Sequence, residues 1–210
     1  MAISAALFDL DGTLVDSLPF IMSTYHLVFK KLNLPWAEAE LIKWIGRPLK
    51  EIAPFFAGGK KDEFLKLYEK YYNLDFENNV SPFPGTAEML DFLKINGFLL
   101  GIVTSKGKEG AERTIKLTGL DNYMDVVITA HDVNVHKPFP DPILKALDVL
   151  NISPGQSLYI GDSYHDIKAG LDAGTTTLGV TWGINTREEL AALNPDGLLE
   201  SWADLKRYLV

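Results

Sequence analysis

The sequence contains no cysteine, which excludes disulfide bonds and thiolate chemistry. It also has no long hydrophobic run, since apolar stretches such as 98–103 fall far short of the roughly 20 residues of a membrane-spanning helix. Basic residues are the minority, because 20 Lys and Arg against 28 Asp and Glu give a formal net charge of −8. Nucleic-acid binding depends on clustered Lys and Arg, so neither nucleic acid nor membrane is an expected partner.

The first ten residues, MAISAALFDL, carry no basic residue and so lack the start of a secretory signal peptide. We therefore expect a cytoplasmic protein. A hydrophobic fraction of 47% and a charged fraction of 23% are ordinary for a folded globular chain. The length of 210 residues suits one domain with an insertion, and a monomer is the default expectation.

The stretch FDLDGTLVDS at residues 8–17 places Asp9 and Asp11 after an apolar strand and before Gly12. Strand residues alternate between faces, so the two carboxylates are expected to point into one small volume. They remain charged together only beside a cation, and otherwise one keeps its proton. Oxygen ligands of this kind favour Mg²⁺, which also takes oxygens from substrate phosphate. The alternatives are an exposed Asp-Gly turn and a calcium loop, whose glycine would have to stand sixth rather than fourth.

The spacing of apolar residues predicts helices over about 18–32, 36–45, 48–56 and 62–76, with no strand pattern between 17 and 79. From residue 86 onward helices alternate with strands expected over 98–103, 125–129, 157–160 and 176–180. Asp141 is predicted to cap one of these helices, and the last two helices are expected near 187 and 201. The alternation predicts an α/β fold, a three-layer Rossmann-like core with a parallel sheet, formed by residues 1–16 and 82–210. Residues 17–81 form an inserted all-helical unit, and the turn-rich segment SPFPG is its hinge.

Ligands of such sheets bind beyond the carboxyl ends of the strands, where two groups of polar residues follow. Thr104 and Ser105 offer a hydroxyl and turn amides to an anion, or else cap the next helix. Lys137 precedes three prolines at alternate positions, which limit its freedom and suit it to hold a phosphate. A solvated surface lysine is the alternative.

The fourth strand ends at Asp162, which is placed like Asp9 and is the natural second carboxylate for Mg²⁺. Asp166 either binds the metal or forms a capping box with Ser163. Arg47, between two predicted helices, is a candidate for binding a substrate carboxylate or second phosphate, with a solvated arginine as the equal alternative. His165 is expected at the mouth of the site, where it would contact the non-reacting end of a substrate.

In order, the segments FDLDGTLVDS, VTSK, HKPFPD and IGDSYHD resemble the four motifs of the haloacid dehalogenase superfamily of phosphohydrolases. The resemblance covers nearly the whole chain and is strongest to phosphoglycolate phosphatases and related bacterial pyrophosphatases with a helical cap, here residues 17–81. It implies a Mg²⁺-dependent phosphatase acting on a small phosphorylated metabolite through an aspartyl-phosphate intermediate.

The resemblance also implies a role for each matching residue. Asp9 is the nucleophile, Asp11 the general acid and base, and Lys137 neutralises the phosphoryl charge. The phosphoryl group is held by Thr104 and Ser105, and Mg²⁺ by Asp9, the backbone carbonyl of Asp11, Asp162 and, directly or through water, Asp166.

Three other functions stay open at this point: an inorganic pyrophosphatase, a sugar phosphomutase and a non-catalytic phosphate-binding domain. Thr13 stands where mutases often have an apolar residue, which disfavours a mutase. The acid pair, Lys137 and Asp162 disfavour a non-catalytic domain. The identity of the substrate depends on the placement of cap residues, which the sequence does not reveal.

Overall fold

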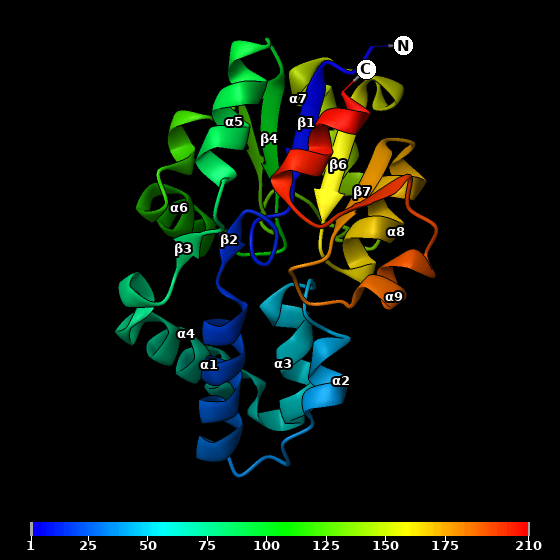
Figure 1. The fold of residues 1–210 in the computed structure, drawn as a ribbon. Helices are drawn as coiled ribbons and strands as arrows, with labels where there is room; N and C mark the ends of the chain where they lie inside the picture. The colour runs from blue at the N-terminus through cyan, green and yellow to red at the C-terminus, as the bar shows by residue number, and fades with distance from the viewer. Residues whose placement is uncertain (1, 210) are drawn as a thin grey trace.

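A computed structural model describes residues 2–209. Its centre is a six-stranded parallel sheet in the order β5-β4-β1-β6-β7-β8 (Figure 1). The strands are β1 (Ala5–Phe8), β4 (Leu99–Val103), β5 (Val126–Ile128), β6 (Ser157–Gly161), β7 (Thr176–Val180) and β8 (Gly197–Leu199). All residues of β1 and β6 are buried, as expected for central strands covered on both faces. The predicted α/β fold with a parallel sheet is confirmed.

Helices cover both faces of the sheet. On one face, α7 (Asp141–Leu150) packs against β4 and β5, α8 (Tyr164–Ala173) packs against β6 and β7, and the two helices contact each other. On the other, α5 (Thr86–Ile95) contacts the C-terminal 3₁₀ helix η5 (Trp202–Tyr208). The remaining helices are α6 (Lys108–Leu117), α9 (Arg187–Ala191) and the short 3₁₀ turns η3 (Leu120–Asn122) and η4 (Pro154–Gln156). Because the strands are parallel, their carboxyl ends all lie at the same edge of the sheet.

Four helices lie below this edge in Figure 1, and we call them the helical unit: α1 (Leu18–Lys31), α2 (Glu38–Ile42), α3 (Leu49–Ala57) and α4 (Lys61–Leu74). The 3₁₀ turns η1 (Gly58–Lys60) and η2 (Phe76–Asn78) flank α4. Phe29 and Phe64 are buried between α1 and α4, with ring centroids 5.7 Å apart. This aromatic core explains why the apolar pattern predicted these helices. The division into two domains at residues 17 and 81 stays a prediction.

Three short strands and one helix start differ from the sequence-based expectation. The strands β2 (Val15–Asp16) and β3 (Ser81–Pro82) pair antiparallel where the chain enters and leaves the helical unit. Like β8, they have only two or three residues, too few to show an alternating pattern. Asp141 does not cap α7. Pro140 holds the cap position and its carbonyl accepts from the amides of Ile143 and Leu144, so Asp141 is the first helical residue.

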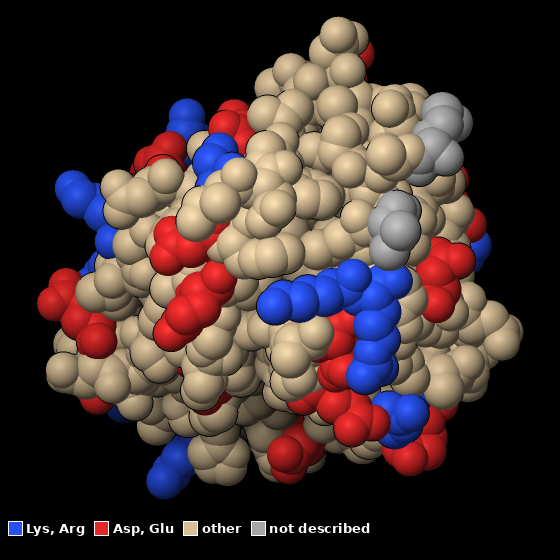
Figure 2. Space-filling model, turned by 45° about the horizontal axis from the view of Figure 1, so that its top comes forward, with Lys and Arg blue, Asp and Glu red and all other residues tan. Residues whose placement is uncertain are grey.

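Charged side chains of both signs are interspersed on the face shown in Figure 2. Ion pairs form between such groups: the Lys168 ammonium lies 2.6 Å from the Asp172 carboxylate, and the Arg187 guanidinium lies 2.6 Å from the Glu200 carboxylate. A continuous basic face, the usual mark of a nucleic-acid-binding surface, does not occur on this side of the molecule. Within residues 2–209, none of the helices has the length and apolar character needed to cross a membrane.

Candidate active site

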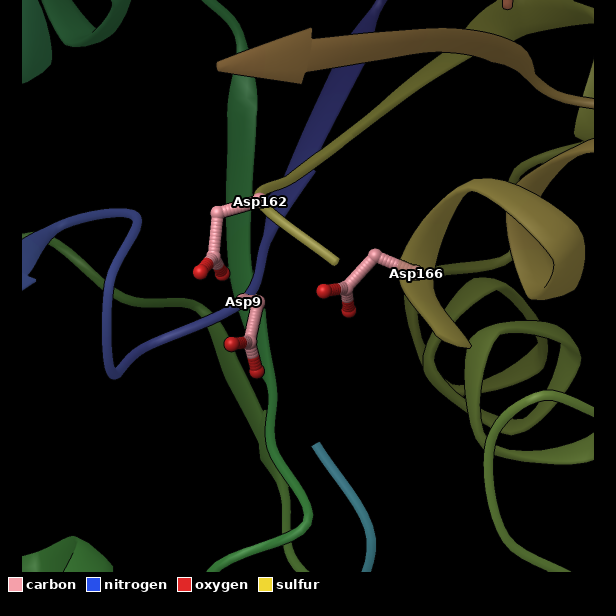
Figure 3. A group of neighbouring side chains, drawn as sticks. All are labelled: Asp9, Asp162 and Asp166. Carbon is pink, nitrogen blue, oxygen red and sulfur yellow. The ribbon is translucent and has the colours of Figure 1, made fainter. Parts of the chain in front are cut away.

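Three buried carboxylates converge at the carboxyl edge of the sheet (Figure 3). Asp9 follows β1, Asp162 follows the adjacent strand β6, and Asp166 lies in the first turn of α8. Each contributes one oxygen to a group whose members lie within 4.8 Å of one another. The pairing of β1 with β6 fixes Asp9 beside Asp162, because the Asp9 amide donates to the Ile160 carbonyl at 2.9 Å. Asp9 and Asp162 therefore lie close together, as their positions after two strands predicted.

The ammonium group of Lys137 lies between two of these carboxylates. Its Nζ is 2.8 Å from Asp9 and 2.6 Å from Asp166, and it also donates to the Val103 carbonyl and the Tyr159 hydroxyl. Burial of an unpaired charge is costly, so these four partners are what keeps a buried lysine charged. Three carboxylates face one ammonium in this cluster, which leaves room for a cation to balance the charge.

Burial and the Lys137 ammonium act in opposite directions on the pKa values of the cluster. It raises the pKa of Asp9 to about 7, although Lys137 partly opposes the shift, and it raises the pKa of Asp162 well above its ordinary value. Burial also opposes ionisation of Asp166, but the Lys137 ammonium and hydrogen bonds from Ser163 and Tyr159 outweigh it and lower that pKa. Asp9 and Asp162 thus tend to hold a proton, and a cation that binds them would have to displace it.

The donor set fits a hard divalent cation. Carboxylate oxygens are the ligands that Mg²⁺ prefers, and one or two carboxylates with water and phosphate oxygens complete its coordination. Asp9, Asp162 and Asp166 could supply such oxygens from one small volume. The carboxylate of Asp11 lies outside this group of three, so its part in metal binding rests on the predicted backbone carbonyl.

The surroundings of Asp162 fix its carboxylate. Thr13 donates its hydroxyl to Oδ1 at 3.1 Å, and the Ile184 amide donates to Oδ2 at 2.8 Å. Gly12 has a φ of +88° and lies so close that a Cβ atom there would collide with the Asp162 carboxylate. A Cβ atom at Gly183, a residue not predicted to matter, would also collide with the Asp162 side chain. The absence of a side chain at Gly12 and Gly183 therefore leaves space for the Asp162 carboxylate.

Asp166 forms the capping box that its sequence position allowed, and its other oxygen faces the carboxylate cluster. Its Oδ2 accepts from the Ser163 amide and hydroxyl, and the Asp166 amide donates back to Ser163 Oγ, which completes a capping box. Its Oδ1 accepts from Lys137 and from the Tyr159 hydroxyl. The capping box thus fixes the Asp166 side chain in an orientation in which its Oδ1 contacts Lys137.

A cavity of about 630 Å³ lies between this edge and the helical unit. Asp9, Thr104 and Ser105 line it from the sheet side, as predicted, and Arg47 lines it from the loop between α2 and α3. The Arg47 guanidinium lies 4.8 Å from the centroid of the Trp44 ring and 3.8 Å from the Glu51 carboxylate. A substrate in the cavity would therefore meet cationic and hydroxyl groups from both sides.

Asp11 also lines the cavity, but its carboxylate has partners of its own. Ser17 donates to Oδ1 at 2.6 Å, and the Lys106 ammonium donates to both oxygens at 2.9 and 3.0 Å. Ser17 stands at the cap position of α1, but its side chain makes no capping bond and binds Asp11 instead. Sequence reasoning did not assign Lys106, although its position two residues after Thr104 put it at the same sheet edge.

His165 is not at the mouth of the site, contrary to the prediction. It is buried, and its Nε2 lies 3.0 Å from the Lys43 carbonyl of the helical unit. The side chain packs against Lys43 and Gly46 of the helical unit and is not among the residues that line the cavity. Tyr159 was also missed, because a tyrosine inside an apolar strand carries no sequence signal of a polar contact.

Comparisons with known proteins agree with this geometry. Residues 6–180 match the family model described as haloacid dehalogenase-like hydrolase. Pyrophosphatase PpaX of Bacillus velezensis is 37% identical over 204 residues, which cover 97% of this chain and 94% of the relative. Pyrophosphatase PpaX of Anoxybacillus flavithermus is 36% identical and covers 98% and 96% of the two chains.

Solved structures are similar over the same length. One from Haemophilus somnus 129pt, described as a predicted phosphoglycolate phosphatase, has a TM-score of 0.87 at 27% identity and covers 98% of this chain and 97% of its own. Another, a haloacid dehalogenase-like hydrolase from Bacteroides fragilis, has a TM-score of 0.87 at 30% identity, with coverage of 97% and 99%. Both similarities include the helical unit as well as the sheet, because they span nearly the whole chain.

Proposed function

The chain belongs to the haloacid dehalogenase-like hydrolase family, and from this premise we propose that it is a Mg²⁺-dependent phosphatase of small phosphorylated metabolites. The observation that carries the proposal is the buried cluster of Asp9, Asp162 and Asp166 around Lys137, open to a cavity of substrate size. A structural cluster of this kind would be costly, because three carboxylates repel one another out of water. A site that binds a cation and a phosphoryl group accounts for it.

Asp9 is the proposed nucleophile. Its carboxylate oxygen attacks phosphorus, and the bond from phosphorus to the leaving oxygen breaks while Asp11 gives that oxygen a proton. In the second step water attacks the phosphorus of the aspartyl-phosphate, Asp11 accepts a proton from the water, and the Asp9 carboxylate is released with inorganic phosphate. Thr104 and Ser105 hold the phosphoryl oxygens, and Lys137 orients the Asp9 carboxylate.

The proposed metal ligands are Asp9, Asp162, the backbone carbonyl of Asp11 and, directly or through water, Asp166. When bound, Mg²⁺ supplies the positive charge that reduces repulsion between a carboxylate nucleophile and an anionic phosphate. Thr13 and the Ile184 amide hold Asp162 in place for this role.

Pyrophosphate is the first candidate substrate, because whole-length relatives at 36% to 37% identity carry the name pyrophosphatase. Phosphoglycolate is the second, supported by the structural neighbour described with that activity. Both substrates have an anionic group beyond the scissile bond, and Arg47, Lys50, Lys106 and Arg113 all line the cavity. Arg47 is the proposed partner for that second anionic group.

Phosphate release from pyrophosphate, phosphoglycolate and hexose phosphates tests the proposal, with and without Mg²⁺. We expect Mg²⁺-dependent hydrolysis with the highest kcat/KM for one of the first two compounds. Activity that is unchanged by a chelator would contradict the metal assignment. The lack of activity on all three classes would favour a phosphate-binding domain.

We infer from the acidic composition that the protein acts without nucleic acid or membrane partners. The cytoplasmic location and the monomeric state remain predictions. We also propose that residues 1–16 and 82–210 form the hydrolase domain and residues 17–81 its cap.

A further inference from the structure

Tyr159 brings a hydroxyl group into the interior of the carboxylate cluster. The residue lies in the middle of β6 and is fully buried, and its hydroxyl donates to Asp166 Oδ1 at 2.9 Å. The same hydroxyl accepts a hydrogen bond from the Lys137 ammonium at 3.1 Å. A buried tyrosine hydroxyl needs a polar partner, because leaving it unpaired is costly. Both partners of this hydroxyl are charged groups of the candidate active site.

The Lys137 ammonium has more acceptors around it than hydrogens to donate. Its three hydrogens face four oxygens, which belong to Asp9, Asp166, the Val103 carbonyl and the Tyr159 hydroxyl. A lysine ammonium is a point charge at the end of a flexible chain, so its neighbours set its position. The bond to Asp166 is the shorter of the two carboxylate bonds, at 2.6 Å against 2.8 Å for Asp9. A stronger pull from Asp166 would therefore weaken the hold on Asp9.

Tyr159 is the neutral donor that shares Asp166 with the lysine. Asp166 Oδ1 accepts from both Lys137 and Tyr159, whereas Oδ2 is held by Ser163. Without the tyrosine hydroxyl, Oδ1 would depend on Lys137 alone, and Lys137 would lose one of its own acceptors. Both effects draw the ammonium toward Asp166. Because β6 pairs with β1, the hydroxyl is fixed relative to Asp9, which directly follows β1.

We propose that Tyr159 is a positioning residue for the nucleophile, because its hydroxyl holds Lys137 where the ammonium orients the Asp9 carboxylate. This inference rests on the proposed phosphatase function. When the hydroxyl is removed, the ammonium shifts toward Asp166 and Asp9 loses part of its orientation. Attack on phosphorus is then slower, because small displacements of a reacting group cost much of the rate. Substrate binding changes little, since Tyr159 does not line the cavity.

The test separates phosphoryl transfer from binding. In single-turnover experiments with Mg²⁺, excess enzyme is mixed with p-nitrophenyl phosphate, and release of p-nitrophenol measures attack by Asp9 whatever the rate of later hydrolysis. We expect Tyr159→Phe to lower the rate at saturating enzyme about tenfold. The enzyme concentration that gives half of this rate should change by less than about twofold. The variant keeps the ring, whose centroid lies 5.8 Å from the Lys137 ammonium, so it removes the hydroxyl alone.

Thr177→Val is the matched control. Thr177 lies opposite Tyr159 on the adjacent strand β7 and is also fully buried, and its hydroxyl bonds to Thr175 rather than to the cluster. The control therefore removes a buried hydroxyl at the same depth of the sheet. We expect both variants to unfold at lower urea concentration than the wild type, but only Tyr159→Phe to slow phosphoryl transfer.

A second measurement tests whether the effect passes through the lysine. In a Lys137→Met background, Tyr159→Phe should change the single-turnover rate by less than about twofold, because the ammonium that the hydroxyl holds is gone. The same tenfold loss with and without Lys137 would overturn the inference. If Lys137→Met does not fold, as judged by circular dichroism, the rate of Tyr159→Phe decides.

The remaining outcomes distinguish the inference from the proposed function. An unchanged rate in Tyr159→Phe, or equal slowing in Thr177→Val, would overturn the inference and leave the phosphatase function standing. If the wild type hydrolyses pyrophosphate but not the aryl ester, the same comparison is made with pyrophosphate. A wild-type protein that is inactive on every phosphate compound tested would overturn the proposed function, and the inference with it.

Discussion

At the scale of single residues, Asp9 is the proposed nucleophile, and its replacement gives the most direct prediction. Asp9→Asn removes the attacking oxygen's charge but keeps the side chain's shape, so we expect kcat to fall by about a thousandfold or more. The fold should persist, since Lys137 keeps its bond to Asp166. Phosphate release and circular dichroism measure both parts.

Asp121→Asn is the control for this variant, because Asp121 is an exposed aspartate of the η3 turn. It should leave turnover unchanged. Substantial activity in Asp9→Asn would show that another group attacks phosphorus.

A second prediction concerns pH and Mg²⁺. Burial raises the pKa of Asp9 to about 7, and that of Asp162 well above its ordinary value, so metal binding must displace protons. We expect the apparent Mg²⁺ affinity to rise as pH increases from about 5.5 to 8, by up to about tenfold per unit for each proton released. Titration calorimetry in buffers of different ionisation enthalpy would count the protons.

The metal-free protein should respond to pH in the opposite sense. Because the pKa of Asp9 is higher in the folded chain than its usual 3.8, the native state binds the proton more tightly than the unfolded state. The free energy of unfolding from this group therefore falls as pH rises from about 4 to 7. Mg²⁺ affinity that does not change with pH would contradict both statements.

Some site residues were predictable from the sequence and others were not. Asp9, Thr104, Lys137 and Asp162 each follow an apolar strand, and parallel strands end at one edge, so their meeting follows from the fold class. Their roles in catalysis stay predictions. The Tyr72 hydroxyl accepts a hydrogen bond from the Lys106 ammonium 34 residues away, whereas the spacing of Tyr72 on an amphipathic helix only indicated packing. Its contact depends on how the helical unit docks, which local patterns do not encode.

At the scale of elements, the turn from β6 to α8 has almost no free space. A Cβ atom at Gly161 would collide with the Asp166 side chain. We therefore expect Gly161→Ala to lower the free energy of unfolding by about 1–3 kcal/mol, the usual cost of overpacking, and to weaken Mg²⁺ binding by displacing Asp166. Denaturant unfolding and a Mg²⁺ titration measure the two effects.

Gly59→Ala is the matched control, because a Cβ atom there would meet open space. It should change neither quantity by more than about 0.5 kcal/mol. If both alanine variants behave alike, the collision at Gly161 has no energetic consequence.

The strands differ in how well the sequence predicts them. The strands β4, β6 and β7 lie within a residue or so of their predicted ranges, since each contains apolar residues next to a turn or a helix start. The ribbon of β2 and β3 is held by contacts between residues 15–16 and 81–82. A pairing across so many residues leaves no local trace in either segment.

At the scale of the whole molecule, one buried apolar cluster runs from the sheet into the helical unit and includes both Phe8 and Phe64. We therefore expect the two parts to unfold in one transition. Phe64→Ala should remove about 3–5 kcal/mol, which for a chain of this size lowers the melting temperature by about 10 °C.

Scanning calorimetry checks this prediction. Leu74→Ala is a suitable control, since Leu74 is 70% exposed at the end of α4 and should hardly change the midpoint. Two separate transitions in Phe64→Ala would show that the helical unit and the sheet fold independently.

The antiparallel pairing of β2 with β3 has a consequence for how such proteins diversify. Val15 faces Pro82 and Asp16 faces Ser81, so the chain departs from the sheet layer and returns to it at neighbouring points, about 5 Å apart. Any insert whose two ends meet at that spacing can be grafted there without moving a strand of the sheet. Evolution can thus exchange the inserted helical unit as a block, while Asp9 and the residues that contact it stay where they are.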